Sequence, residues 1–263
     1  MDRRMLLEQS LFDAIGNHEL SIVFQPIVDL RTGRLHAAEA LARWTHPSLG
    51  PVEPGEFIPI AEESGMIDPI GLWVMDAALS QVALWRASGV VQADFTVHVN
   101  VSGKQLHGRF AEQITQLLLL HSTDPATLML ELTESVLMRT GEEATDVLWA
   151  VQDLGVPLAL DDFGTGFSSL SYLLQAHVHT VKIDRSFICG MPDDPTRRAI
   201  VEAVISLARA LGLRVIAEGV ETGPEIDLLT GMGCDLGQGF LLSQPLFASG
   251  MAAFIDSTAG TRR

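Results

Sequence analysis

Five acidic side chains stand where apolar runs typical of β-strands come to an end. They are Glu39, Glu131, Asp161, Asp162 and Glu218. A carboxylate at the apolar end of a strand costs several kcal/mol of folding free energy unless a positive group pairs with it. Five such carboxylates in one chain therefore predict bound cations, and we expect a metal site.

The types of donor indicate which metals suit this site. Asn100 ends another apolar run, so the candidate ligands are Glu, Asp and Asn, with no cysteine and no obligatory histidine. Oxygen donors favour hard divalent ions such as Mg²⁺ or Mn²⁺ over zinc. His98 shares a strand face with Asn100, and we expect it to be a hydrogen-bonded core residue rather than a ligand.

Composition limits the class of protein. The chain has 263 residues, 47% of them hydrophobic, which suits one barrel-sized domain with a large core. A formal net charge of −16 disfavours nonspecific binding to nucleic-acid polymers or anionic membranes. Two cysteines make no disulfide framework, the N-terminal residues do not resemble a signal peptide, and no long apolar run indicates a membrane segment. We therefore expect a cytoplasmic protein.

Apolar periodicity divides the chain into alternating strands and helices. The predicted strands are 21–29, 35–44, 95–101, 128–133, 157–161, 180–183, 214–217 and 235–240. The predicted helices are 3–16, 54–64, 68–87, 109–121, 142–154, a short one from Ser168, 195–211 and 223–230. This pattern gives a lead-in helix over 1–17, a barrel domain over 18–256 and a flexible tail over 257–263.

Eight strands alternating with helices predict an α/β fold, a (β/α)8 TIM-like barrel. The turn at 31–34 is too short for a crossover helix, so the first strand is expected to run antiparallel to the second. Reactive groups of such barrels gather at the carboxyl ends of the strands, where the five acids stand. Because alternate residues share a face, Glu39, Leu41 and Arg43 are expected to point together into the barrel mouth.

Ten short motifs, in this order, resemble those of EAL-type cyclic di-GMP phosphodiesterases over nearly the whole chain. The tripeptide that names the family is Glu39-Ala40-Leu41. The nine others are Gln25-Pro26-Ile27-Val28, Arg43-Trp44, Phe57-Ile58-Pro59, Val99-Asn100-Val101-Ser102, Glu131-Leu132-Thr133-Glu134, Asp161-Asp162-Phe163-Gly164-Thr165-Gly166, Lys182-Ile183-Asp184, Glu218-Gly219-Val220-Glu221 and Gln238-Gly239-Phe240. Each motif alone is weak, but together they form a specific signature.

The resemblance implies hydrolysis of cyclic di-GMP to linear pGpG by water activated between two divalent ions, Mg²⁺ or Mn²⁺. It implies that one ion is held by Glu39, Asn100, Glu131 and Asp161, and the other by Asp161, Asp162 and Glu218. It also implies catalytic roles for Glu39, Lys182, Glu218 and Gln238, substrate contacts from Gln25, Leu41, Arg43 and Asp184, and a loop anchor at Glu134. Glu221 is set aside as a helix-capping acid.

Other functions stay open at this point. A non-catalytic receptor for cyclic di-GMP is the main alternative, although every implied ligand position is intact. A metal-dependent barrel hydrolase for another phosphoester is a third. The family resemblance also implies a possible homodimer through helices beside the loop at 164–168. Two alternatives stay open for the chain itself: it works alone, or it belongs to a longer parent chain with regulatory domains. The sequence departs from the family mainly at His177-Val178-His179, which enters a strand at its amino end.

Overall fold

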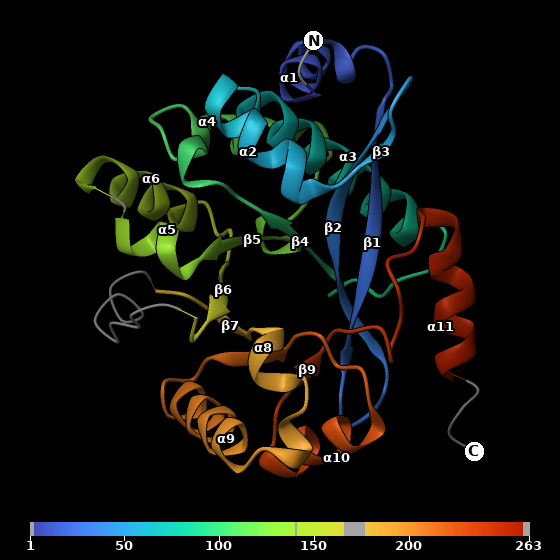
Figure 1. Cartoon of the computed structure of the whole chain (residues 1–263), viewed down its shortest axis with the longest axis vertical. Coiled ribbons are helices and arrows are strands. Elements are labelled where there is room, and N and C mark those ends of the chain that lie inside the picture. The colour runs from blue at the N-terminus through green and yellow to red at the C-terminus, as the bar shows by residue number, and fades with distance from the viewer. Residues whose placement is uncertain (1–2, 140, 166–176, 260–263) are drawn as a thin grey trace.

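The structure is a computed structural model that describes residues 3–139, 141–165 and 177–259. Within these residues a nine-stranded sheet curls into a barrel with helices around it (Figure 1). The strands are β1 (Leu20–Asp29), β2 (Leu35–His46), β3 (Gly50–Val52), β4 (Thr96–Asn100), β5 (Leu128–Thr133), β6 (Leu158–Phe163), β7 (Thr180–Ile183), β8 (Arg214–Ala217) and β9 (Leu236–Gly237). The helices are α1 (Arg3–Ala14), α2 (Pro54–Ser64), α3 (Ile67–Ala87), α4 (Phe110–Leu120), α5 (Glu134–Arg139), α6 (Glu142–Asp153), α8 (Arg185–Ile188), α9 (Pro195–Ala210), α10 (Gly223–Met232) and α11 (Met251–Ala259).

The sheet closes because β1 pairs with both β2 and β9. Its order is β1-β9-β8-β7-β6-β5-β4-β2-β3, and β3 is a short addition outside the barrel, paired to β2. β1 is antiparallel to both of its neighbours, whereas the other barrel strands run parallel to one another. The predicted eight-stranded barrel with an antiparallel first strand is therefore confirmed.

A tight turn sets the antiparallel direction of β1. The Asp29 carboxylate accepts hydrogen bonds from the Thr32 backbone N–H at 2.6 Å and from the Thr32 hydroxyl at 2.7 Å. Gly33 follows with a φ of 69°, a left-handed conformation that glycine adopts without steric cost. The chain thus reverses within a few residues, with no room for a crossover helix.

The helices bury apolar faces against the outside of the barrel. α3 contributes Trp85, whose ring lies 4.6 Å from that of Phe24 on β1 in an edge-to-face arrangement. By length and composition alone α3 is also the one helix among the described residues that could cross a membrane. Such a test is also passed by core helices, and α3 buries nine residues against the barrel.

The lead-in helix α1 docks on the body as its amphipathic pattern predicts. Leu7, Leu11 and Ala14 are fully buried, and Arg3 pairs with Glu56 of α2 at 2.6 Å. At the other end α11 runs to Ala259, past the expected start of the tail, and residues 260–263 lie outside the described part. The domain boundaries stay predictions.

Three helices were not predicted: α5, α8 and α11. α5 and α8 span six and four residues, too few to give an apolar periodicity. The short helix predicted from Ser168 falls on residues outside the described ranges.

Candidate active site

Polar side chains from successive strands meet at the carboxyl end of the barrel. They are Glu39 on β2, Asn100 on β4, Glu131 on β5, Asp161 and Asp162 on β6, Lys182 on β7, Glu218 directly after β8 and Gln238 directly after β9. The strand register aligns them, because Asn100 stands beside Glu131 and Glu39 stands beside Gln25 of β1. The sequence-predicted acids therefore converge on one site.

Lys182 lies at the centre of this site and is only 1% exposed. Its Nζ lies 2.6 Å from a Glu218 oxygen and 2.7 Å from a Glu131 oxygen. It also lies 3.3 Å from Asp161 and 3.5 Å from Glu39. One ammonium thus contacts four carboxylates, which leaves the cluster with an excess of negative charge.

Amide side chains hold Glu39 in place. Asn100 donates to Glu39 Oε1 at 2.6 Å, and Gln238 donates to Glu39 Oε2 at 2.7 Å. Gln238 also donates to Gln25 Oε1 at 3.1 Å, which links β9 to β1 across the barrel closure. Both carboxylate oxygens of Glu39 are therefore oriented by neighbouring strands.

A break in the strand register brings the adjacent residues Asp161 and Asp162 to the same site. Neighbours along a regular strand point to opposite faces, but the pairing of β6 with β7 shifts between Leu160 and Phe163. Asp162 adopts a φ of 55°, a left-handed conformation that is unusual for a residue with a side chain. Carboxylate oxygens of Asp161, Asp162 and Glu218 consequently lie within 4.8 Å of one another.

His98 forms a buried hydrogen bond with Glu131. Its Nδ1–H donates to Glu131 Oε1 at 2.7 Å, and both side chains are almost completely buried. Burial and the nearby Lys182 charge lower the pKa of His98 to about 3, so the ring is neutral. The expectation that His98 is a hydrogen-bonded core residue fits this geometry, and its partner is a candidate metal ligand.

Burial and mutual repulsion raise the pKa of several acids in the cluster. Desolvation raises the pKa of Glu131 well above its ordinary value, against the attraction of Lys182. Desolvation and the charges of Asp161 and Glu39 likewise raise the pKa of Glu218 to about 8, and desolvation also raises that of Asp162. The cluster resists full ionisation, which added cations would relieve.

The pKa values of Lys182 and Glu39 shift instead in the direction that favours the charged form of each side chain. Burial acts against the ammonium of Lys182, but the surrounding carboxylates outweigh it and raise the pKa well above its ordinary value. Burial also acts against the charged form of Glu39, yet Lys182 and the amides of Gln238 and Asn100 lower its pKa. The centre of the site therefore holds a permanent ion pair.

Glu134, the predicted loop anchor, reaches the loop after Asp162. It is 5% exposed and accepts a hydrogen bond from the Gly164 backbone N–H at 3.3 Å through Oε2, while its Oε1 has no partner among the described residues. The loop at 164–168 is described only as far as residue 165.

A cavity of about 290 Å³ opens above the carboxylates. Its lining residues are Gln25, Glu39, Leu41, Asp161, Arg185, Glu218, Gly219, Glu221, Gln238, Gly239 and Phe240. Gln25 and Leu41 thus lie where substrate contacts were predicted. Arg43 is not among the lining residues and donates to the Ala42 carbonyl, while the Asp184 carboxylate caps α8 by accepting from the Ser186 N–H.

Comparison with known proteins agrees with this site. The family description "EAL domain" matches residues 8–245. This chain belongs to the EAL domain family. Its relatives include the bifunctional diguanylate cyclase/cyclic di-GMP phosphodiesterase MucR of Pseudomonas aeruginosa, 40% identical over 253 residues, which are 96% of this chain and 37% of MucR. The cyclic di-GMP phosphodiesterase PdeR of Escherichia coli is 39% identical over 241 residues, 91% of this chain and 36% of PdeR.

Solved structures extend the comparison to three dimensions. A structure described as the PaMucR phosphodiesterase in complex with c-di-GMP matches this EAL domain with a TM-score of 0.88 at 40% identity, covering 94% of this chain and 99% of that one. This EAL domain therefore spans well under half the length of the two curated relatives, while matching nearly all of the solved MucR chain.

The donor set of this EAL domain fits divalent metal ions. Every donor is a carboxylate or amide oxygen, and three carboxylates lie close enough to share one ion. The excess negative charge around Lys182 gives such ions a favourable place to bind.

Sequence reasoning missed Arg185, Glu221 and Phe240 as residues of the mouth. Glu221 was expected to cap α10, but Glu225 does so, accepting from the backbone N–H groups of Glu221 and Thr222 at 2.8 and 2.9 Å. Glu221 is therefore not the capping residue of α10, and its complementarity to the helix dipole stays a prediction. Glu221 lies instead 3.6 Å from the Arg185 guanidinium. The only available signal was that all three residues end or follow a recognised motif.

Proposed function

We propose that this EAL domain hydrolyses cyclic di-GMP to linear pGpG with two divalent metal ions, Mg²⁺ or Mn²⁺. The observation that carries this proposal is the convergence of five carboxylates, from the ends of four strands, at the barrel mouth, where four of them contact one buried lysine. Relatives named as cyclic di-GMP phosphodiesterases, at about 40% identity, support the choice of substrate.

The proposed ligands form two overlapping groups. One ion would take oxygens of Glu39, Asn100, Glu131 and Asp161. The other would take Asp161, Asp162 and Glu218, whose oxygens lie within 4.8 Å of one another. When bound, such ions polarise a phosphate oxygen and lower the pKa of a water molecule.

The protein side chains supply the remaining steps. Glu218 lines the cavity at the mouth and lies 2.6 Å from the Lys182 ammonium, so it is our candidate to take a proton from the attacking water. Lys182 stays protonated and stabilises negative charge that develops on the phosphate. Gln238 holds Glu39 in position through their 2.7 Å hydrogen bond. The Arg185 guanidinium at the mouth is suited to bind a substrate phosphate.

The test is a cleavage assay with the purified chain, cyclic di-GMP and Mg²⁺ or Mn²⁺. We expect pGpG to appear with metal and not in the presence of a chelator. Glu39→Gln should reduce kcat by at least about a hundredfold. The substitution removes a proposed metal ligand and, with the same carboxylate, the acceptor of the hydrogen bonds from Asn100 and Gln238. Glu63→Gln is a matched control, since Glu63 is an exposed acid that pairs with Arg4 on the surface.

Binding without cleavage, at saturating metal, would contradict the proposal and favour the non-catalytic receptor. Faster cleavage of simple phosphodiesters than of cyclic di-GMP would favour a hydrolase for another substrate. Both results are distinguishable from failure of the metal site, because calorimetry with Mn²⁺ alone measures ion binding directly.

We also propose a cytoplasmic location. Cys189 and Cys234 are both free thiols in the structure, as expected in a reducing compartment. The greater length of the relatives supports further, regulatory domains in a parent chain. A homodimer stays a prediction.

A further inference from the structure

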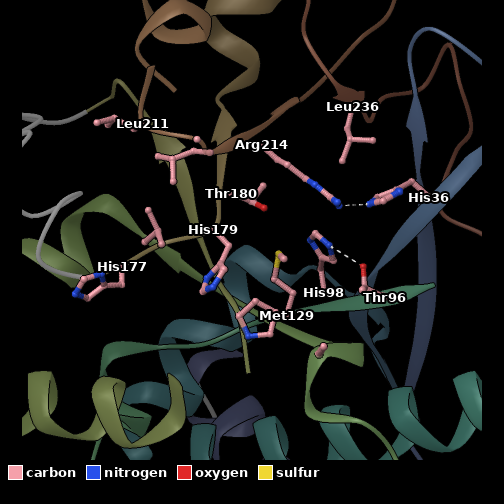
Figure 2. Close-up of a pocket in the computed structure, with 15 residues that line it drawn as sticks. His36, Thr96, His98, Met129, His177, His179, Thr180, Leu211, Arg214 and Leu236 are labelled. Carbon is pink, nitrogen blue, oxygen red and sulfur yellow. Dashed lines mark hydrogen bonds between the residues drawn. The ribbon is translucent and has the colours of Figure 1, made fainter. Parts of the chain in front are cut away.

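A second cavity, of about 560 Å³, lies away from the carboxylates, and Figure 2 shows the side chains that line it. Its lining includes the first residues of four strands: Thr96, Thr180, Arg214 and Leu236. It is therefore set among the amino ends of the strands, where the proposed phosphodiesterase reaction has no role for it.

The polar lining of this cavity is basic and imidazole-rich. Four of the eight histidines of the chain line it, namely His36, His98, His177 and His179, together with Arg214. No lining residue is acidic, in a chain with 33 Asp and Glu. Figure 2 shows Arg214 and His36 meeting on one side of the cavity and His177 and His179 on the other.

Arg214 is the one permanent charge among the lining residues. Its Nη1 donates to His36 Nε2 at 2.8 Å, and within the described part of the chain it makes no ion pair with a carboxylate. Burial and the Arg214 charge lower the pKa of His36, although Asp94 and Asp29 outside the lining act in the opposite direction. Burial and His177 likewise lower the pKa of His179. The cavity thus offers the Arg214 guanidinium beside the imidazoles of His36 and His179, whose lowered pKa values favour the neutral form that can still donate one hydrogen bond.

The imidazoles are not arranged as a metal site. Among the described residues, only Asp161, Asp162 and Glu218 form a group of three ligands within 4.8 Å of one another. The four histidines are spread around the cavity instead (Figure 2). Such spacing suits an extended ligand rather than an ion.

The remaining walls are apolar. Ala126, Met129, Pro157, Val178, Leu211, Gly212, Leu213 and Leu236 complete the lining. The volume falls in the range of small-molecule sites, which combine apolar walls with a few polar groups that fix orientation. A guanidinium with imidazole donors matches a carboxylate, sulfonate or phosphate head, and the walls match an apolar body.

We propose that the cavity at the amino end of the barrel is a binding site for a small organic anion with an apolar or aromatic body. The site is separate from the metal centre, but His98 connects the two. This buried ring lines the cavity, where its Nε2 lies 3.5 Å from the Thr96 hydroxyl, and its Nδ1 bonds Glu131 on the other side.

The test uses 8-anilinonaphthalene-1-sulfonate, an aromatic anion whose fluorescence rises on binding, titrated into the whole chain. Arg214→Gln removes the charge and Leu211→Trp fills the space, and each should weaken binding at least about tenfold. Matched controls are Arg109→Gln and Leu84→Trp, at exposed positions outside the lining, which should bind within about twofold of the parent. Inorganic phosphate, which lacks the apolar body, should compete only weakly.

Unchanged binding in either Arg214→Gln or Leu211→Trp, in a variant that folds, would overturn the proposal. So would loss of binding in Arg185→Gln with Arg214→Gln unaffected, because the probe would then sit at the barrel mouth. Thermal unfolding followed by circular dichroism identifies any variant that fails to fold. Because the two variants alter different walls, one folded variant with normal affinity is sufficient to reject the site.

Discussion

A single buried ammonium in contact with four carboxylates determines the electrostatics of the active site. Lys182 can neutralise one of them, so Glu131 and Glu218 have raised pKa values while Glu39 stays ionised. Divalent ions would neutralise the excess negative charge of the carboxylates, and each Glu39 oxygen could keep the hydrogen bond that it accepts. The strongly acidic cluster is therefore a favourable place for metal ions, and Lys182 is the cation that contacts it in the structure.

Replacing Lys182 with methionine should destabilise the metal-free protein. Removal of one partner from a buried ionic network costs about 3–5 kcal/mol, because the remaining charges are left unpaired. We expect a Tm in EDTA lower by roughly 5–15 °C, with a larger recovery on adding Mn²⁺ than the parent gains. Lys104→Met, at an exposed lysine, is the control. Equal Tm values for Lys182→Met and the parent in EDTA would contradict this account of the site.

The raised pKa values predict how metal-free stability depends on pH. Glu131, Glu218 and Asp162 hold protons in the folded state that they release in the unfolded state, so the folded protein binds more protons above pH 4.5. Stability from these groups is present at low pH and is lost as pH rises toward about 8, the pKa of Glu218. The pKa of His98 is lowered to about 3, so its contribution to stability changes with pH in the opposite direction. That contribution changes only below about pH 6.5.

We therefore expect the Tm in EDTA to fall by a few °C between about pH 6.5 and pH 8. Saturating Mn²⁺ should make the Tm depend less on pH, since bound ions replace the protons held by the carboxyl groups. Glu218→Gln should reduce the slope without metal. A metal-free Tm that rises across this interval would show that the carboxyl groups are already ionised in the fold.

Asp162 combines a ligand role with an unusual backbone, and the two can be separated. Asparagine tolerates the left-handed conformation, so Asp162→Asn should keep the parent Tm while weakening Mn²⁺ binding at least about tenfold. Alanine lacks that tolerance, so Asp162→Ala should also lose about 1–2 kcal/mol of stability. Calorimetric Mn²⁺ titration and thermal unfolding give the two readouts, with Asp153→Asn, an exposed acid at the end of α6, as the control. Normal Mn²⁺ affinity in Asp162→Asn would remove this residue from the ligand set.

At the scale of elements, the sequence predicts well what depends on periodicity and strand order. All eight barrel strands and the acids at their ends follow from apolar runs, because parallel strands bring their carboxyl ends together. The register break in β6 does not follow, since strand parity would place Asp161 and Asp162 on opposite faces. Nor does the position of Arg185, which depends on α8, a helix of four residues.

Gly239, which follows the last strand, keeps the neighbouring Gln238 amide in position beside Glu39. A Cβ at Gly239 would lie 2.2 Å from the backbone N and O of Val220, so Gly239→Ala must displace one of the two segments. We expect a loss of roughly 2–4 kcal/mol in stability and a fall in kcat, because Gln238 moves away from Glu39.

Gly231→Ala is the matched control for that substitution. Gly231 lies within α10 with no atom inside 4 Å of its Cβ position, so alanine there should stabilise the protein by up to about 1 kcal/mol. Denaturant unfolding measures both changes, and equal effects of the two alanines would refute the proposed contact with Val220.

At the scale of the whole molecule, the net charge opposes the proposed substrate. The chain carries −16 and cyclic di-GMP is a dianion, so long-range repulsion should slow their encounter. Local positive charge at the mouth comes from Arg185 and from bound ions, and these act only at short range. The chain as a whole therefore repels the dinucleotide at long range, whereas the mouth attracts it at short range.

This difference between long-range repulsion and short-range attraction predicts that kcat/KM rises with ionic strength at saturating Mn²⁺. The Debye length falls from about 30 Å at 0.01 M salt to about 10 Å at 0.1 M, which screens the distant acids more than the contacts within the site. We expect an increase of about two- to fivefold over this interval, measured as pGpG formation at low substrate concentration. Arg185→Gln should lower kcat/KM at every salt concentration and make the rise steeper, because its attraction no longer offsets the repulsion. A decrease with salt in the parent chain would instead mean that the charges at the mouth dominate the approach of the dinucleotide.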